Sequence, residues 1–147
     1  MNCGRIFLAA LAVTVFGMAW GILSCGWLFN RVYELPPVAV WKTPEAMMTP
    51  LFWAINVAGH FVLAVIFVGV FAWIGNGLCG GRFGRGFRYG LAVWLVGILP
   101  GMFAVYMWMA VNPWWPVYTA INQLIALPIC GIIASAIVLP CTCECKG

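Results

Sequence analysis

Charged side chains are scarce in this sequence. Of 147 residues, 7 are Lys or Arg, 3 are Asp or Glu and 1 is His, so 7% of the chain is charged, where a typical soluble domain carries about 25%. Residues 89–143 contain no charged side chain at all. A surface with so little charge would not stay hydrated, which excludes a soluble globular domain.

Groups that titrate are equally few. The carboxylates are Glu34, Glu45 and Glu144, and the single histidine is His60. General acid–base chemistry depends on positioned imidazoles and carboxylates, so we expect a protein that is not an enzyme. The net charge of +4 comes from basic residues near the ends of apolar runs, and we expect no binding of nucleic acid.

Long uncharged runs dominate what remains. Residues 6–30, 46–81 and 89–143 lack Asp, Glu, Lys and Arg, and roughly 20 apolar residues are enough to cross a hydrocarbon core of about 30 Å. The sequence therefore predicts an all-α membrane protein, a four-transmembrane-helix bundle forming one domain over residues 1–147. The expected helices cover about 6–29, 51–74, 87–111 and 118–139, with a flexible Gly/Arg loop at 75–88 and a Cys-rich tail at 141–147.

Local signals support the second of these helices. Thr49 suits the N-cap position and Pro50 the first helical position. Thr43-Pro44 repeats the signal six residues earlier, which predicts a short interfacial turn at 44–48. Residues 112–116 predict a tight turn between the third and fourth helices.

The distribution of Lys and Arg predicts the orientation, because positive charge gathers on the cytoplasmic side. With four spans, one side holds Arg5, Arg82, Arg85, Arg88 and Lys146. On the opposite side Arg31 and Lys42 are balanced by Glu34 and Glu45. We expect both termini in the cytoplasm (N-in/C-in) and a multi-pass protein of the bacterial inner membrane.

His60 is the first candidate functional residue. It lies near the centre of the second expected helix, with Asn56 one turn away on the same face. An ionisable side chain at membrane depth is costly and marks a functional hypothesis. His60 could ligate a haem, a chlorophyll-type pigment or a metal, contact a quinone, or relay protons. It could also be structural, bonding to a neighbouring helix. A bis-histidine haem would need a second histidine from a partner.

Other polar residues are expected at a similar depth in the outer half of the bundle. The expected intramembrane cluster consists of Asn56, His60, Asn122, Gln123 and Ser24. Polar groups in lipid must be satisfied internally, so these side chains either bond to one another or contact a small polar-headed ligand.

Two prolines lie inside expected helices. Pro100 and Pro128 each remove a backbone donor, leaving the carbonyls of Val96 and Leu124 without their usual partner. They predict kinks, which could form a cavity or gate, although proline is also frequent in spanning helices without such a role.

Glycines at a spacing of four predict helix packing. Gly17 and Gly21 form one pair, and Gly97 and Gly101 another. Such pairs let helix backbones approach closely, so they bear on assembly and not on chemistry.

The tail carries Cys141, Cys143 and Cys145. Thiolates bind soft metals, but three of them fit no four-cysteine cluster pattern. Acylation or an inert tail is the favoured interpretation, and no metal is expected.

A loose sequence resemblance extends over the second to fourth helices. Residues 41–45, Gly86, residues 90–91, Trp94 and Pro100 resemble the pattern of small uncharacterised bacterial four-helix inner-membrane proteins. The resemblance implies the same topology, and it implies no activity and no functional residue.

The expected function is that of a non-enzymatic accessory or scaffolding subunit in a larger membrane protein complex, in contact with lipid and with other membrane subunits. One alternative is a small homo-oligomeric transporter or channel that uses the outer polar layer. The other is a subunit that contacts a cofactor or quinone through His60. No cofactor is required by the first interpretation.

Overall fold

A computed structural model describes residues 3–36 and 44–139, and all regular structure in these ranges is helical. It contains four helices that are long and apolar enough to cross a membrane: Cys3–Leu28, Pro50–Gly77, Arg82–Trp108 and Trp114–Val138. The prediction of an all-α chain with four candidate spans is confirmed.

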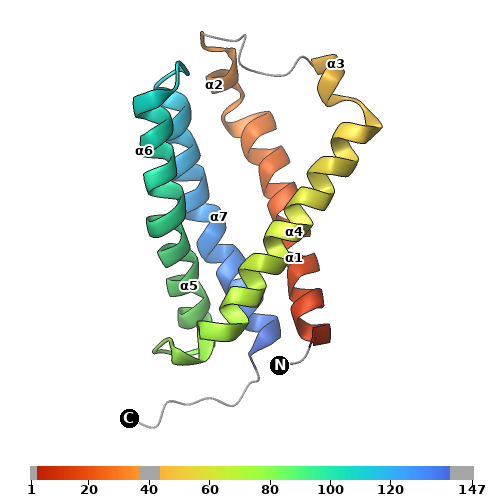
Figure 1. Ribbon diagram of the computed structural model, residues 1–147, viewed down its shortest axis with the longest axis vertical. Helices are drawn as coiled ribbons and strands as arrows, with labels where there is room; N and C mark the ends of the chain where they lie inside the picture. The colour runs from red at the N-terminus through yellow and green to blue at the C-terminus, as the bar shows by residue number, and fades with distance from the viewer. Residues whose placement is uncertain (1–2, 37–43, 140–147) are drawn as a thin grey trace.

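The candidate spans are built from several helical elements (Figure 1). The first joins α1 (Cys3–Leu23) to a π-helical turn (Ser24–Leu28), and the short helices α2 (Asn30–Glu34) and α3 (Pro44–Met47) follow. The second is α4 (Pro50–Ile74) with a 3-10 turn (Gly75–Gly77). The third joins α5 (Arg82–Val93), a π-helical turn (Trp94–Ile98) and α6 (Leu99–Trp108), and the fourth is α7 (Trp114–Val138).

Two pairs of helices organise the bundle. The continuous α5–α6 span runs beside α7, while α1 crosses α4 and also contacts α7 (Figure 1). The start of α1, the end of α7 and the α4–α5 connection share one end, which we call the inner end. Helices α2 and α3 lie at the other, outer end, and toward it α4 diverges from α7 (Figure 1).

The second helix begins as the sequence predicts. The Thr49 side chain accepts a hydrogen bond from the Phe52 amide at 3.3 Å and donates one to the Ala46 carbonyl at 3.1 Å. Pro50 occupies the first helical turn, where its missing N–H costs nothing. The short turn expected before this helix is present as α3.

The prediction of a flexible loop at 75–88 is wrong for most of its length. The third candidate span begins at Arg82 and not near Phe87, and the 3-10 turn takes up Gly75–Gly77. The chain reverses over residues 78–81, where Gly80 adopts a φ of +110° that side chains rarely tolerate. The basic residues therefore belong to a helix and not to a loop. Similarly, α7 begins at Trp114, inside the turn expected at 112–116.

The three arginines of α5 form hydrogen bonds at this connection. Each guanidinium donates to a backbone carbonyl at the inner end: Arg82 to Ser135 (3.1 Å), Arg85 to Gly80 (2.8 Å) and Arg88 to Cys79 (2.7 Å). Arg85 is buried, with 4% of its surface exposed. The bonds from Arg85 and Arg88 satisfy carbonyls of the glycine-rich segment 79–81. The bond from Arg82 joins α5 to the last turns of α7.

The α1–α4 crossing is made by small side chains near the inner end. Ala9, Ala10 and Val13 of α1 are buried in the same cluster as Ala64 and Val68 of α4. Short side chains allow helix axes to approach closely. The crossing lies toward the inner end, so α4 diverges toward the outer end.

Helices α5 and α7 meet through glycine backbones. A Cβ atom placed on Gly86 would lie 2.6 Å from the Ser135 hydroxyl oxygen, and one on Gly90 would lie 2.6 Å from the Pro128 Cα. A Cβ on Gly131 would overlap the Gly86 carbonyl oxygen. Gly86 and Gly90 are spaced by four residues, the pattern that permits close contact between helices.

The glycines chosen from the sequence do not make such contacts within the chain. A Cβ on any of the predicted packing residues, Gly17, Gly21, Gly97 and Gly101, would meet no atom of the described structure within 4 Å. Their spacing is that of packing glycines, but no other helix of the described structure approaches them closely. Within the chain, close helix contact is made instead by Gly86, Gly90 and Gly131. Packing of the other four glycines against a partner stays a prediction.

Candidate functional site

The expected polar layer is divided between two places in the structure. Asn122 on α7 is buried and accepts a hydrogen bond from the Trp20 indole N–H of α1 at 2.7 Å. The bond joins two spans directly, and it satisfies the amide oxygen inside the bundle. The partner of Asn122 is thus an indole, which the sequence pattern of amides, hydroxyls and histidine does not include.

Ser24 lies on the same side of the bundle. It is fully buried in the π-helical turn at the end of α1, where its hydroxyl lies 3.4 Å from the Gly21 carbonyl oxygen, to which it donates. One residue later, Cys25 accepts a hydrogen bond from the Tyr33 hydroxyl at 3.3 Å. Ser24 and Asn122 are therefore the members of the expected cluster that α1 and α7 bring to one side of the bundle.

Aromatic rings fill the space around these groups. The Phe29 and Tyr118 ring centroids are 3.9 Å apart, and Tyr118 is buried. Burial raises the pKa of the Tyr33 hydroxyl above its usual value of 10.0, and the hydrogen bond to Cys25 acts in the same direction. Tyr33 therefore stays protonated at neutral pH and acts as a donor. Aromatic rings therefore pack closely on this side of the site.

Asn56 and His60 lie apart from that cluster, on the outer half of α4. His60 is exposed and Asn56 is partly buried. The His60 Nδ1 atom lies 3.0 Å from the carbonyl oxygen of Asn56, in its own helix. Within the described residues, neither side chain is hydrogen-bonded to another helix. The interpretation of His60 as a link between helices is therefore not met inside this chain.

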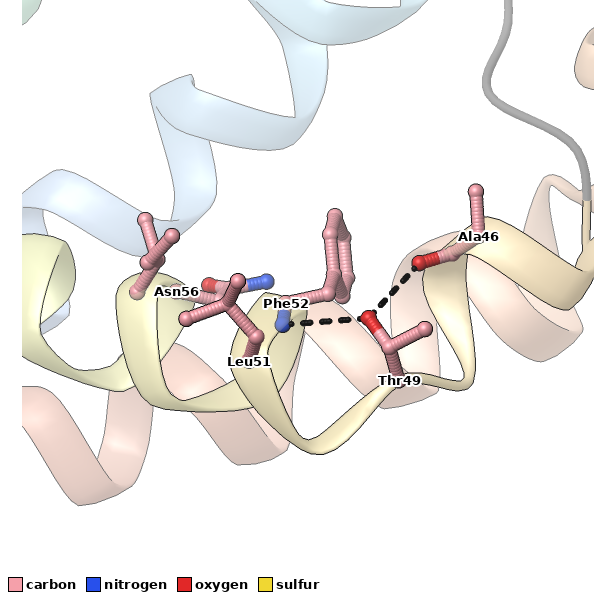
Figure 2. Close-up of a pocket in the computed structure, with 6 residues that line it drawn as sticks. Ala46, Thr49, Leu51, Phe52 and Asn56 are labelled. Carbon is pink, nitrogen blue, oxygen red and sulfur yellow. Dashed lines mark hydrogen bonds between the residues drawn. The ribbon is translucent and has the colours of Figure 1, made fainter.

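A cavity of about 320 Å³ lies at the outer end of α4. Its lining residues are Ala46, Thr49, Leu51, Phe52, Ile55 and Asn56. Figure 2 shows the Thr49 hydroxyl between the Ala46 carbonyl and the Phe52 amide, with Asn56 one turn further along the helix. The hydroxyl is engaged in capping, so Asn56 supplies the remaining side-chain polar group of this cavity.

The prolines disturb their helices differently. Pro100 lies two residues after the π-helical turn Trp94–Ile98, where the Leu99 N–H bonds to the Trp94 carbonyl five residues earlier. Pro128 is buried inside α7, which remains α-helical on both sides of it, and packs against Gly90. The cavity described above lies near neither proline. Gln123, the remaining member of the expected cluster, is partly buried on α7.

Two more hydrogen bonds between spans come from aromatic side chains. Tyr89 donates from its hydroxyl to the Phe67 carbonyl at 2.7 Å, and Trp94 donates from its indole to the Ala120 carbonyl at 2.7 Å. Tyrosine and tryptophan are enriched at the two membrane–water interfaces of membrane proteins. In this chain, aromatic side chains within the spans donate hydrogen bonds between helices that we expected from amides and from His60.

Metal-binding side chains do not gather in the part of the chain that the structure describes. No group of three or more His, Cys, Asp or Glu residues is found there that could hold a metal ion. Cys141, Cys143 and Cys145 lie outside the described residues, so the interpretation of the tail stays a prediction.

No protein-family model, curated protein or solved structure matches the chain. Inference about function therefore rests on the geometry above.

Proposed function

We propose that this protein is an integral membrane accessory subunit of a larger membrane assembly. The observation that supports the proposal is the exposed outer half of α4, which carries His60 and Asn56 without hydrogen bonds to another described helix. Polar and ionisable side chains within membrane spans are costly, and they almost always face a bundle interior or an aqueous cavity. A helix from a partner protein would supply that interior.

Gly17 and Gly21 of α1 also have free space beside them in the described structure. Gly17 lies two turns beyond Ala10 on nearly the same face of α1, and Ala10 is fully buried against the bundle. Yet a Cβ on Gly17 or Gly21 would meet nothing within 4 Å in the described structure. Small residues on an open face leave room for another helix backbone.

The division of the polar layer favours an accessory subunit over a transporter. A transport pathway would need polar groups that face a common passage, but Asn122 is bonded to Trp20 and Ser24 is buried. Asn56 and His60 lie on a different helix, α4, and no hydrogen bond within the described residues joins them to Asn122 or Ser24. A partner contact at α4 requires no passage through the chain.

A photo-crosslinking amino acid at Val57 tests this proposal. Val57 is exposed and follows Asn56 directly, and it lies three residues before His60, so it shares that side of α4. We expect irradiation of intact cells to give an adduct with an unlike protein, detected as a mass shift and identified by mass spectrometry.

The matched control places the same amino acid at Val96, which is 80% exposed on the third span. We expect lipid adducts there and no discrete protein band. Adducts between two copies of the chain at Val57 would favour the homo-oligomeric transporter. Absence of any protein adduct at Val57 would remove the proposal.

We further propose that the inner end faces the cytoplasm of a bacterium, with the protein in the inner membrane. The proposal is supported by the gathering of Arg82, Arg85 and Arg88 at this end, because basic residues resist translocation. The start of α1 and the end of α7 lie at the same end (Figure 1).

Reporter fusions test this orientation. We expect a reporter at the C-terminus to be active only in its cytoplasmic form, and one inserted within residues 36–42 only in its exported form. A fusion after Met109, at the outer end of the third span, serves as an internal control and should behave as exported. An exported C-terminus would contradict the proposed orientation.

A further inference from the structure

Positive charge gathers at the inner end of the bundle. Arg5, in the first turn of α1, and the three arginines of α5 lie at this end (Figure 1). The acidic side chains of the described residues are Glu34 and Glu45, on α2 and α3 at the outer end. In the sequence that follows α7, Glu144 is balanced by Lys146. The charge distribution of the chain therefore makes the inner end attractive to anions.

Two of these arginines converge on one turn. Arg85 donates from Nε to the Gly80 carbonyl at 2.8 Å, and Arg88 donates from Nη1 to the Cys79 carbonyl at 2.7 Å. The two carbonyls belong to consecutive residues, so both guanidinium groups lie beside the chain reversal at 78–81. Like charges in such proximity repel each other. An anion bound beside them would offset this repulsion.

Arg88 is the member of this pair that a ligand can reach. Its side chain is exposed, whereas Arg85 is buried. The bond to the Cys79 carbonyl holds the Arg88 guanidinium against Gly80, where a Cβ atom would lie 3.6 Å from Nη1. A guanidinium carries further N–H donors besides the one used in this bond. Such donors form paired, charge-assisted hydrogen bonds with phosphate oxygens, so the geometry suits a phosphate group.

The surface of α5 beside Arg88 is apolar. Phe83 and Phe87 are 63% and 48% exposed, and their spacing of four residues places them on one face of the helix. Phe87 precedes Arg88 directly, and it lies about 6 Å further into the span than Phe83. A ligand that fits this surface has an anionic group at Arg88 and apolar chains along the two phenylalanines. An anionic phospholipid has both parts, whereas a free phosphate would leave the phenylalanines without a contact.

We propose that this end of α5 binds an anionic phospholipid. Arg88 hydrogen-bonds to the lipid phosphate, the neighbouring charge of Arg85 adds attraction, and the acyl chains lie along Phe83 and Phe87. Basic sites beside spanning helices hold anionic headgroups in this way. A zwitterionic headgroup fits less well, because its ammonium group would meet the same positive charge. The site uses residues of this chain alone, so the inference goes beyond the accessory role and does not depend on a partner subunit.

Native mass spectrometry of the purified protein, titrated in detergent with phosphatidylglycerol, tests the inference. We expect one retained lipid, bound several-fold more tightly than phosphatidylcholine with the same acyl chains. Arg88→Gln keeps a polar side chain without the charge, and it should weaken phosphatidylglycerol binding by about fivefold, the effect of one arginine near anionic lipid. Arg88→Lys keeps the charge and should retain most of the binding. Equal binding of the two lipids by the unmodified protein would overturn the inference, whatever the variants do.

Two matched variants and a competitor make the result specific. Arg31→Gln at the outer end and Arg5→Gln on α1 remove the same charge as Arg88→Gln, and both should leave phosphatidylglycerol binding nearly unchanged. An equal loss in Arg5→Gln and Arg88→Gln would show diffuse attraction by the whole inner end and overturn the site at α5. Millimolar inorganic phosphate should not displace the lipid. Displacement by phosphate would show that the site takes a soluble anion, and it would overturn the assignment to a phospholipid.

Discussion

Replacing Gly131 with leucine is expected to separate α5 from α7 and to leave little folded protein. A Cβ at this position would overlap the carbonyl oxygen of Gly86 and lie 3.2 Å from the backbone nitrogen of Gly90. These are backbone atoms, so no side-chain rotation relieves the overlap. Overpacking costs about 1–3 kcal/mol where side chains can yield, and here we expect a loss of about 3 kcal/mol or more.

Unfolding in mixed detergent micelles, followed by circular dichroism, measures this loss. The matched control is Gly97→Leu, since a Cβ at Gly97 meets nothing within 4 Å in the described structure. Both variants add the same side chain to a spanning helix, so their apolar character is equal. A similar loss of stability in both would show that close α5–α7 contact is not the cause.

The four candidate spans could be predicted because a span depends on the length and composition of a local stretch of sequence. A run such as residues 89–143, without charge and broken only near Asn112 and Pro113, has the length and polarity for two crossings. The start of α4 was equally accessible, because capping by Thr49 depends on neighbours in the sequence. These features require no knowledge of tertiary contacts.

The packing glycines were not predictable in the same way. Gly97 and Gly101 have the same spacing as Gly86 and Gly90, but only the second pair meets another helix within the chain. The spacing of two glycines defines one face of a helix, but it does not show whether another helix packs against that face. The alternation of glycine with arginine suggested a flexible basic loop over residues 75–88. The hydrogen bond from Arg82 to the Ser135 carbonyl, 53 residues further along the chain, could not be read from that local pattern.

Part of the predicted polar cluster does not come together in the structure, and the reason is geometric. Ser24 and Asn122 lie on the same side of the bundle because α1 and α7 are in contact. His60 was expected to join them on the basis of depth alone. The depth of a residue in the membrane can be estimated from its position along the helix. The tilt of the helix is set by packing against neighbouring helices. The crossing near Ala10 and Ala64 turns the outer half of α4 away from α7 (Figure 1). His60 makes no hydrogen bond to another described helix.

Replacing Phe71 with alanine is expected to lower stability by about 2 kcal/mol. Phe71 is the largest fully buried side chain of the described structure, and its ring centroid lies 5.2 Å from that of Tyr89. Lipid chains are as apolar as the ring, so burying the ring between helices brings no hydrophobic gain. The expected loss of stability therefore comes from lost packing contacts. Removing a phenyl group opens on the order of 100 Å³, and about 24 cal/mol for each Å³ of cavity gives the expected value.

Trp73→Ala provides the comparison on the same helix. Trp73 is 80% exposed, so lipid chains would replace its contacts, and we expect a change within about 0.5 kcal/mol. Both variants remove an aromatic side chain from the last turns of α4, two residues apart, and differ in the face that they affect. The same micellar unfolding measurement distinguishes them. Equal losses for the two would contradict the placement of Phe71 toward α5, and a larger loss for Trp73 would mean that α4 presents the opposite face to the bundle.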